Sequence, residues 1–396
     1  MHTLPKTPPL IILALASAVM IGPFSLDTYL PAFPAIAAAL EVDEQAISLS
    51  VSVYIISLAL GQLVGGALSD RFGRKSVLFG GLGLFAVTSL FLAQAQTLNS
   101  LLLGRAVQAF GAGWALVSVP ALVRDRLSGQ EAAKLFSMMG LIAIIAPAIA
   151  PSIGSLLLKL GPWQLVFYFL AFYAVLIMPL LAHMFATWAL PPPARSGPQI
   201  GFIARYVDVL SNRAALPFIG WQVGCFSIVM IFISHASFIY QGHFGLSEDG
   251  FALFFALNIV AMMGFNLTNR ALLARLQSVR ILRMGTVLQA ASVLVLVVAA
   301  ALDSSLVVIV LLLALSIGSV ALIGPNIQAC FLEHFPTSGG TAAALMGASQ
   351  FGFAGIISAF TALLPHTITA MFAAMLVCAA GNLFFMWRLQ VNSRAG

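Results

Sequence analysis

Long apolar segments, each about the length needed to cross a bilayer, restrict what this chain can fold into. Of its 396 residues, 61% are apolar and only 8% are charged, whereas a soluble domain carries about 25% charged residues. A membrane-spanning helix needs roughly 20 predominantly apolar residues. The sequence therefore predicts an all-α membrane protein, and its net charge of +6 does not require a nucleic-acid partner.

Polar, proline-containing or glycine-containing breaks divide the chain into twelve apolar segments. The longest polar stretch, residues 191–213, contains three consecutive prolines and separates the first six segments from the last six. We therefore expect two six-helix bundles, residues 1–190 and 214–396, joined by a central cytoplasmic linker, residues 191–213. The predicted spans are 9–32, 46–68, 77–96, 99–123, 135–158, 163–187, 215–238, 250–270, 283–302, 305–329, 340–364 and 367–388.

The basic residues predict how these spans are oriented. With twelve spans both termini lie on one side of the membrane, and nearly all of the 18 Lys and Arg residues fall on that side. The opposite side carries mainly acidic residues. Because basic residues favour the cytoplasmic side, we expect the N-terminus and the C-terminus to be cytoplasmic.

Two charged residues lie inside predicted spans, Asp27 in the first and Arg105 in the fourth. A charge in hydrocarbon is costly unless it is paired, hydrated or neutralised, and such residues usually mark ion or substrate pathways. Both lie in the outer halves of their helices at similar depth, so we expect an electrostatic pair, which Gln108 extends. Proton coupling and a permanent structural ion pair are the two alternatives for it.

Three segments resemble a known transporter family. The segment from Gly65 to Lys75 is similar to the helix 2–3 loop signature of the major facilitator superfamily. The segment that begins at Asp27 resembles the first-helix signature of its bicyclomycin-resistance (Bcr/CflA) drug exporters, and the segment that begins at Arg105 resembles the fourth-helix motif of proton-driven members. The segments read Gly65-Gly66-Ala-Leu-Ser-Asp70-Arg71-Phe-Gly73-Arg74-Lys75, Asp27-Thr-Tyr-Leu-Pro31-Ala-Phe-Pro34-Ala-Ile and Arg105-Ala-Val-Gln108-Ala-Phe-Gly111-Ala-Gly113.

The resemblance implies the major facilitator fold in a multi-pass protein of the bacterial inner membrane. It also implies proton-coupled efflux, or antiport, of small drug-like compounds by alternating access. A metabolite exporter or a proton symporter on the same fold remains the alternative. An enzyme is not expected, because the sequence contains no phosphate loop, zinc motif or nucleophile elbow.

The resemblance also assigns a conformational gating loop after the second span. Asp70 is expected to interact with the positive N-terminal end of a helix in the other half, near Gly339. A local salt bridge is the alternative, and Asp125 is expected either to join this network or to form a solvated cluster. The loop residues assigned to this role are Gly66, Asp70, Arg71, Gly73, Arg74 and Lys75.

The fifth span departs from the Gly-Pro-x-x-Gly-Gly unit of exporters, because Ala150 and Ser155 replace small glycines. Pro147 and Pro151 are nevertheless expected to kink this helix. Gly154 is expected to let a neighbouring helix come close.

Aromatic and amide side chains within the spans are the candidates for a substrate cavity, because drug-binding pockets combine apolar walls with a few polar groups. For each residue, packing between helices is the alternative. His235 is expected to have a packing role rather than to be a second titrating group. The cavity candidates are Tyr29, Tyr54, Gln108, Trp114, Phe226, Phe232, Asn258 and Asn326.

The expected partners are the lipid bilayer and a small-molecule drug or metabolite. No nucleic acid is expected, and the fold-level expectation is a monomer. The three cysteines and six histidines show no metal-ligand spacing, so we expect no metal and no cofactor. The proton gradient would then be the energy source.

Overall fold

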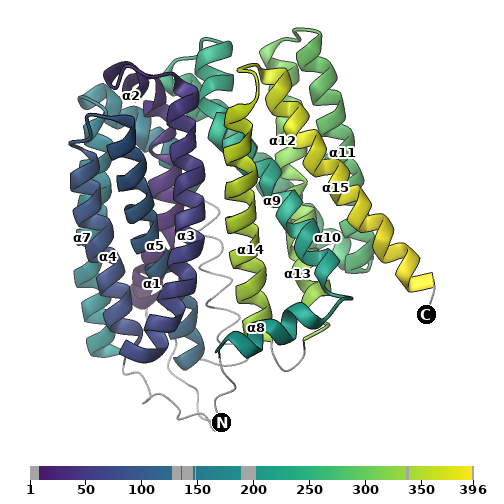
Figure 1. The fold of residues 1–396 in the computed structure, drawn as a ribbon, viewed down its shortest axis with the longest axis horizontal. Helices are drawn as coiled ribbons and strands as arrows, with labels where there is room; N and C mark the ends of the chain where they lie inside the picture. Colours follow the sequence, from purple (N-terminus) through teal and green to yellow (C-terminus); the bar gives the residue numbers. More distant parts are fainter. Residues whose placement is uncertain are drawn as a thin grey trace. The chain divides into compact units, whose positions relative to one another are not determined.

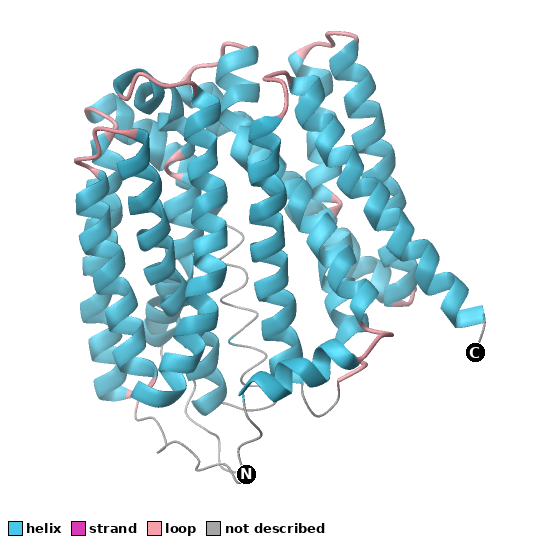
Figure 2. Ribbon diagram, viewed as in Figure 1, coloured by secondary structure: helices cyan, strands magenta, loops and turns pink. Residues whose placement is uncertain are grey.

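The computed structural model describes residues 9–126, 149–188, 202–335 and 339–394, together with positions 135, 146 and 147. In these residues the chain forms helices joined by short loops, without strands (Figure 2). Eleven of the described helices are long and apolar enough to cross a membrane. This confirms the predicted all-α membrane fold. In the remaining predicted span, 135–158, positions 136–145 and 148 lie outside the described residues, and the end of the span lies in the apolar helix Ile149–Leu160.

The chain divides into two compact units, Met1–Val42 with Ser57–Ser196, and Asp43–Ile56 with Gly197–Gly396. One long helix, α3 (Glu44–Phe72), belongs to both, because its beginning groups with the second unit and its later part with the first. The other described elements of the first unit are α1 (Pro9–Asp27), η1 (Leu30–Ala32), α2 (Phe33–Ala39), α4 (Arg74–Leu92), α5 (Leu98–Arg126), the helix Ile149–Leu160 and α7 (Gln164–Thr187) (Figure 1).

The first span is longer than predicted, since it continues past residue 32 to Ala39. Its helix is interrupted after Asp27 and resumes as the short 3₁₀ turn η1 and then α2. Pro31 and Pro34 lie in the first turns of these two elements, where a missing backbone N–H costs little. The two prolines therefore interrupt the helix without ending the apolar segment.

Glycines let α5 approach its neighbours in the first unit closely. A Cβ added to Gly113 would lie 2.6 Å from the carbonyl oxygen of Leu58 and 2.7 Å from the amide nitrogen of Gln62, both on α3. A Cβ added to Gly111 would lie 2.7 Å from the carbonyl oxygen of Gly81 on α4. Small residues at such crossings allow backbones to meet, and this packing fixes the helix that carries Arg105.

The second unit is built around α9 (Leu216–Ser237), which packs against α13, α14 and α15. The helix continues directly into the π-helix η2 (Phe238–His243). The other elements of this unit, besides the beginning of α3, are α8 (Phe202–Ser211), α10 (Glu248–Leu273), α11 (Ser278–Ala301), α12 (Leu306–Gly318), α13 (Val320–Leu332), α14 (Gly339–Phe360), η3 (Thr361–Leu363) and α15 (Ile368–Arg394).

The helix α8 lies within residues 191–213, the stretch that the sequence predicts to be a linker. It contacts α14 and lies near the end of that helix (Figure 1). Val209 of α8 is fully buried in an apolar cluster with Trp221 of α9 and Phe331 of α13. The last part of the polar stretch is therefore anchored to the second unit by an apolar contact.

We predict that Gly113→Ala lowers the thermal stability of the purified protein, because the added methyl group meets backbone atoms of α3 that cannot move aside easily. Overpacking of this kind costs about 1–3 kcal/mol. The matched control is Gly83→Ala on α4, where an added Cβ has no other atom within 4 Å and alanine favours the helix. Equal melting temperatures for the two variants in a fluorescence-based unfolding assay would contradict the close approach at Gly113.

Candidate functional site

A buried cation lies at the centre of the first unit. Arg105 on α5 is 0% exposed. Its Nη1 donates hydrogen bonds to the carbonyl oxygen of Ser25 at 3.1 Å, to Ser25 Oγ at 3.0 Å and to Gln108 Oε1 at 2.6 Å. Hydrogen bonds to a charged donor are shorter and stronger than neutral ones. These contacts hold the guanidinium against α1.

Gln108 carries this polar cluster on to α4. Its Nε2 donates to Ser89 Oγ at 2.7 Å, and the Ser89 hydroxyl donates in turn to the carbonyl oxygen of Phe85 at 2.7 Å. Gln108 therefore extends the cluster around Arg105, as the sequence predicts. Sequence reasoning missed Ser25 and Ser89, whose contacts with other helices leave no mark in the local pattern.

The aromatic ring of Tyr29 covers the guanidinium of Arg105, with the Arg105 Cζ 4.6 Å from the ring centre. Tyr29 is fully buried and packs against Phe33 and Phe167, with ring centroids 4.9 Å and 5.5 Å away. A cation over an aromatic face is favourable, more so when water is excluded. The structure therefore places this predicted cavity residue in the arginine cluster.

Asp27 ends α1 and is 3% exposed. Its Oδ1 is buried and has no hydrogen-bond partner among the described residues. Within that part of the chain the expected pair with Arg105 does not form, because the guanidinium faces Ser25. Ser25 and Asp27 are two residues apart, and therefore point to nearly opposite sides of a helix.

The break after Asp27 is tightly packed by the fifth span. A Cβ added to Gly154 would collide with the carbonyl oxygen of Thr28 and would come within 3.2 Å of Pro31. This agrees with the close-contact role that the sequence predicts for Gly154. Pro151 lies in the helix Ile149–Leu160 and is buried, whereas much of the span around Pro147 lies outside the described residues.

The turn between α3 and α4 has a clear conformational requirement. Gly73 separates the two helices at φ +86°, a left-handed conformation that glycine adopts without steric cost. Arg71 lies 5.2 Å from the ring centre of Phe72, and the Lys75 nitrogen lies 5.7 Å from that of Phe185. The side chain of Asp70 lies outside the described residues, so its gating partner near Gly339 stays a prediction.

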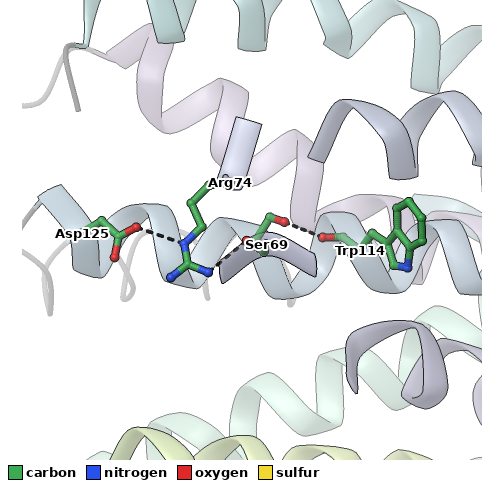
Figure 3. Close-up of polar contacts among 5 residues, drawn as sticks. Ser69, Arg74, Trp114 and Asp125 are labelled. Atoms are coloured by element: carbon green, nitrogen blue, oxygen red, sulfur yellow. Dashed lines mark hydrogen bonds and ion pairs between the residues drawn. The ribbon is translucent and has the colours of Figure 1, made fainter. Parts of the chain in front are cut away.

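Arg74 and Asp125 form an ion pair at this end of the first unit (Figure 3). Arg74 Nε donates to Asp125 Oδ2 at 3.1 Å, and its Nη1 donates to Ser69 Oγ at 3.0 Å. Asp125 therefore does join the loop that contains Arg74. Since 43% of the Asp125 side chain is exposed, the pair contributes at most about 1 kcal/mol to stability.

Two other cavity candidates lie on α5 and α3. Trp114 on α5 packs against helix backbones, because a Cβ added to Gly65 of α3 or Gly81 of α4 would lie within 3 Å of it. Its position favours packing between helices over substrate contact. Tyr54 is buried in the part of α3 that belongs to the second unit.

The aromatic cavity candidates of the second unit pack in two separate pairs of rings. Phe226 of α9 meets Phe351 of α14 edge to face, with centroids 4.9 Å apart. Phe232 is buried and stacks on Phe255 at 5.8 Å. These rings therefore do not form one cluster.

The two asparagine candidates are held by hydrogen bonds within the bundle. Asn258 Nδ2 donates to Tyr240 Oη at 3.1 Å. Asn326 Nδ2 donates to Asn269 Oδ1 at 2.7 Å. Both asparagines are buried. Among the described residues no group of three or more His, Cys, Asp or Glu side chains could hold a metal ion.

Comparisons with known proteins agree with this fold. Residues 15–359 match the Major Facilitator Superfamily. The chain is 28% identical over 392 residues to the bicyclomycin resistance protein homolog of Haemophilus influenzae, covering 97% of each chain. It is 30% identical over 239 residues, 60% of each chain, to the multidrug resistance protein MdtL of Escherichia coli O157:H7.

Solved structures have the same fold at low sequence identity. The POT family transporter PepTSo has a TM-score of 0.78 at 16% identity and covers 99% of each chain. The D-xylose-proton symporter has a TM-score of 0.77 at 16% identity and covers 96% of this chain and 97% of that one.

The apolar helices and the polar cluster buried among them define a membrane transporter of small molecules. The chain belongs to the major facilitator superfamily, whose members are transporters rather than enzymes. It is a multi-pass protein of the bacterial inner membrane, as the sequence predicts. The resemblance to bicyclomycin-resistance proteins is also confirmed.

We predict that Gln108→Leu destabilises the protein by about 1.5–3 kcal/mol, because the Arg105 guanidinium loses a charge-assisted hydrogen bond in a buried position. Reversible unfolding in mixed micelles measures this difference. The matched control is Gln94→Leu in the exposed loop after α4, which should change stability little. Equal stability of the Gln108 variant and the wild type would show that Gln108 is not needed to stabilise the cation.

We predict that Asp125→Asn changes the unfolding free energy by no more than about 1 kcal/mol, because the ion pair with Arg74 is solvent-exposed. Added salt should lower the stability of the wild type more than that of this variant, because salt screens an exposed ion pair. A salt-independent loss of several kcal/mol would instead indicate a buried network at this turn.

Proposed function

We propose that this transporter exports small drug-like compounds across the bacterial inner membrane in exchange for protons. The relatives named as bicyclomycin resistance and multidrug resistance proteins support export of such compounds. Alternating access is the accompanying mechanism, in which two helical repeats rock about a site near the middle of the membrane.

The observation that carries the proposal is the carboxyl group of Asp27, buried at a helix break and with one oxygen unpartnered among the described residues. A carboxyl group in apolar surroundings is stable when it is neutral and ionises when water or a cation reaches it. A chain that moves this break between a dry and a wet environment would therefore bind and release a proton at Asp27.

Arg105 would act on Asp27 through α1 rather than by a direct ion pair. The guanidinium donates to the backbone and side chain of Ser25, two residues before Asp27. A change in the path of α1 at the break would alter the distance between the two charges. The attraction between them falls with distance and with the entry of water, so the same movement would change how readily Asp27 releases its proton.

The residues that face the substrate are part of the same proposal. Phe226 and Phe351 are partly exposed aromatic rings in the second unit, and rings of this kind suit apolar, drug-like ligands. Tyr29 and Gln108 would act indirectly, since both contact the guanidinium of Arg105.

A proton symporter or a metabolite exporter is the second candidate function. The D-xylose-proton symporter shares the fold at 16% identity, and this likeness bears on the fold alone. In an exchanger, substrate and protons move in opposite directions, whereas in a symporter they move together. The direction of the substrate-evoked pH change therefore separates the two.

We predict that Asp27→Asn abolishes uphill efflux but retains energy-independent exchange of substrate, because the amide keeps the shape of the side chain and cannot carry a proton. The measurement is accumulation of a panel of toxic dyes and antibiotics in cells that lack their own pumps, with and without a protonophore.

The matched control is Asp303→Asn, in an exposed loop between α11 and α12. Asp303 has a positive φ of 48°, which asparagine tolerates, so this variant should transport normally. Protonophore-sensitive efflux by the Asp27 variant at the wild-type rate would contradict the assignment of proton coupling to Asp27.

A further inference from the structure

The imidazole of His235, near the end of α9, is held in one tautomer. Its Nε2 lies 2.7 Å from Thr361 Oγ1 in η3. The Thr361 hydroxyl donates its hydrogen to the carbonyl oxygen of Ser358 at 2.5 Å. A hydroxyl has one hydrogen to donate, so Thr361 accepts from His235. The hydrogen of the neutral ring is therefore on Nε2.

In this tautomer Nδ1 carries no hydrogen and has a free lone pair. His235 is 1% exposed, and Nδ1 has no hydrogen-bond partner among the described residues. Buried polar atoms nearly always have a partner, and an unpartnered one calls for an explanation. A neutral imidazole whose donor nitrogen is bonded and whose acceptor nitrogen is bare is prepared to receive a proton.

The ring lies where α9 is tied to α14 and η3. Next to His235 on α9, Ser234 Oγ lies 2.7 Å from Ser358 Oγ of α14, and this hydrogen bond joins the two helices. Two residues after His235 the α-helix ends and the π-helix η2 begins. π-Helical turns are rare and occur frequently at functional sites. Packing alone does not account for a bare nitrogen at such a junction.

Several other titratable groups lie at this end of the second unit. His366, in the loop after η3, stacks on Phe238 of η2 with ring centroids 3.9 Å apart. Burial lowers the pKa of His366, and the negative charge of Asp43 opposes that shift. A positive charge on His366 would repel a positive charge on His235. The remaining groups are Glu44 at the start of α3, Tyr240 and His243 in η2, and Glu248 and Asp249 at the start of α10; α14, η3 and the first turns of α15 carry none.

The segment that contains Thr361 also holds the beginning of α3. Gln45 Nε2 donates to the carbonyl oxygen of Ala362 at 2.8 Å and to that of Leu364 at 3.2 Å. Glu44 Oε2 is buried nearby and has no partner among the described residues. A positive charge on His235 would therefore arise beside the segment to which the beginning of α3 is attached.

We propose that Nδ1 of His235 is a second proton-binding site of this transporter, separate from Asp27. The proton comes from water, forms the Nδ1–H bond of an imidazolium and leaves by the reverse step. The added charge changes the attachment of α3 at Gln45 and so changes the rate of the transport cycle. This inference rests on the proposed function only in assuming that the chain transports a substrate, because it concerns pH sensitivity and not energy coupling.

The test uses substrate exchange without a gradient, measured as a function of pH in proteoliposomes in the Asp27→Asn background. Asp27 cannot bind a proton in this background, so any pH dependence that remains comes from another group. The test of His235 is therefore independent of the test of proton coupling at Asp27. The change to make is His235→Gln, because a glutamine amide can still donate to Thr361 but cannot take up a proton. The matched control is His183→Gln at an exposed histidine of α7.

The expected result is an exchange rate that changes at least threefold between about pH 4 and 8, a window that extends below the usual one for histidine because burial disfavours the charged ring. His235→Gln should remove this dependence, and His183→Gln should leave it unchanged. Thr361→Val should move the inflection without removing it, because the imidazole remains. A pH profile of the His235 variant that superimposes on its parent would overturn the proposal.

A second measurement needs no variant of His235. The wild-type protein labelled with ¹⁵N-histidine carries six histidines, and His→Gln changes at the other five assign the remaining ring signals to His235. The Nδ1 signal is expected to move from the position of an unprotonated nitrogen toward that of a protonated one as the pH falls from about 8 to 4. Ring signals that do not change over this range would overturn the proposal even if His235→Gln does not fold.

Discussion

The need to stabilise a fully buried guanidinium determines how the first unit is put together. Arg105 is fully buried, and a buried charge without polar partners costs several kcal/mol, so the acceptors around its Nη1 matter for stability. Ser25 on α1 and Gln108 on α5 provide acceptors, and Ser89 on α4 holds Gln108 in place. Three helices are thus fixed around one cation, and the glycine contacts of α5 let them come close enough to do so.

The same arrangement keeps the two intramembrane charges apart. Arg105 is engaged with one side of α1, whereas Asp27 ends that helix on another side. A permanent ion pair would stabilise the protein but would leave Asp27 less able to exchange a proton. A cation held by neutral groups, with an acid at a nearby helix break, allows the interaction to change as the helix path changes. The separation therefore supports the proposed coupling role of Asp27.

The sequence predicts most of the spans, because the length of an apolar segment and the bilayer thickness set them. Asp27 and Arg105 stood out because charges are rare in such segments, and Gln108 followed from its helical spacing. Ser25 and Ser89 could not be found this way, since their role depends on which helices meet. The continuation of the first span to Ala39 does not follow from the sequence, because Pro31 and Pro34 are typical of a helix end.

Two further features depend on tertiary contacts. The grouping of the beginning of α3 with the second unit has no local sequence signal. The tautomer of His235 depends on the hydrogen bond that Thr361 makes with Ser358. In both cases no sequence motif marks the residues, and their environment is set by residues that are distant in the chain and close in space. The sequence shows a histidine in an apolar segment and favours a packing role for it.

The most direct test of the account is proton movement itself. Inside-out membrane vesicles with an acidic lumen and a pH-sensitive dye report whether added substrate releases lumenal protons. The account predicts that substrate dissipates the pH gradient in vesicles with the wild-type transporter and leaves it unchanged in vesicles with Asp27→Asn. Acidification in response to substrate, or an equal response from both proteins, would contradict exchange at Asp27.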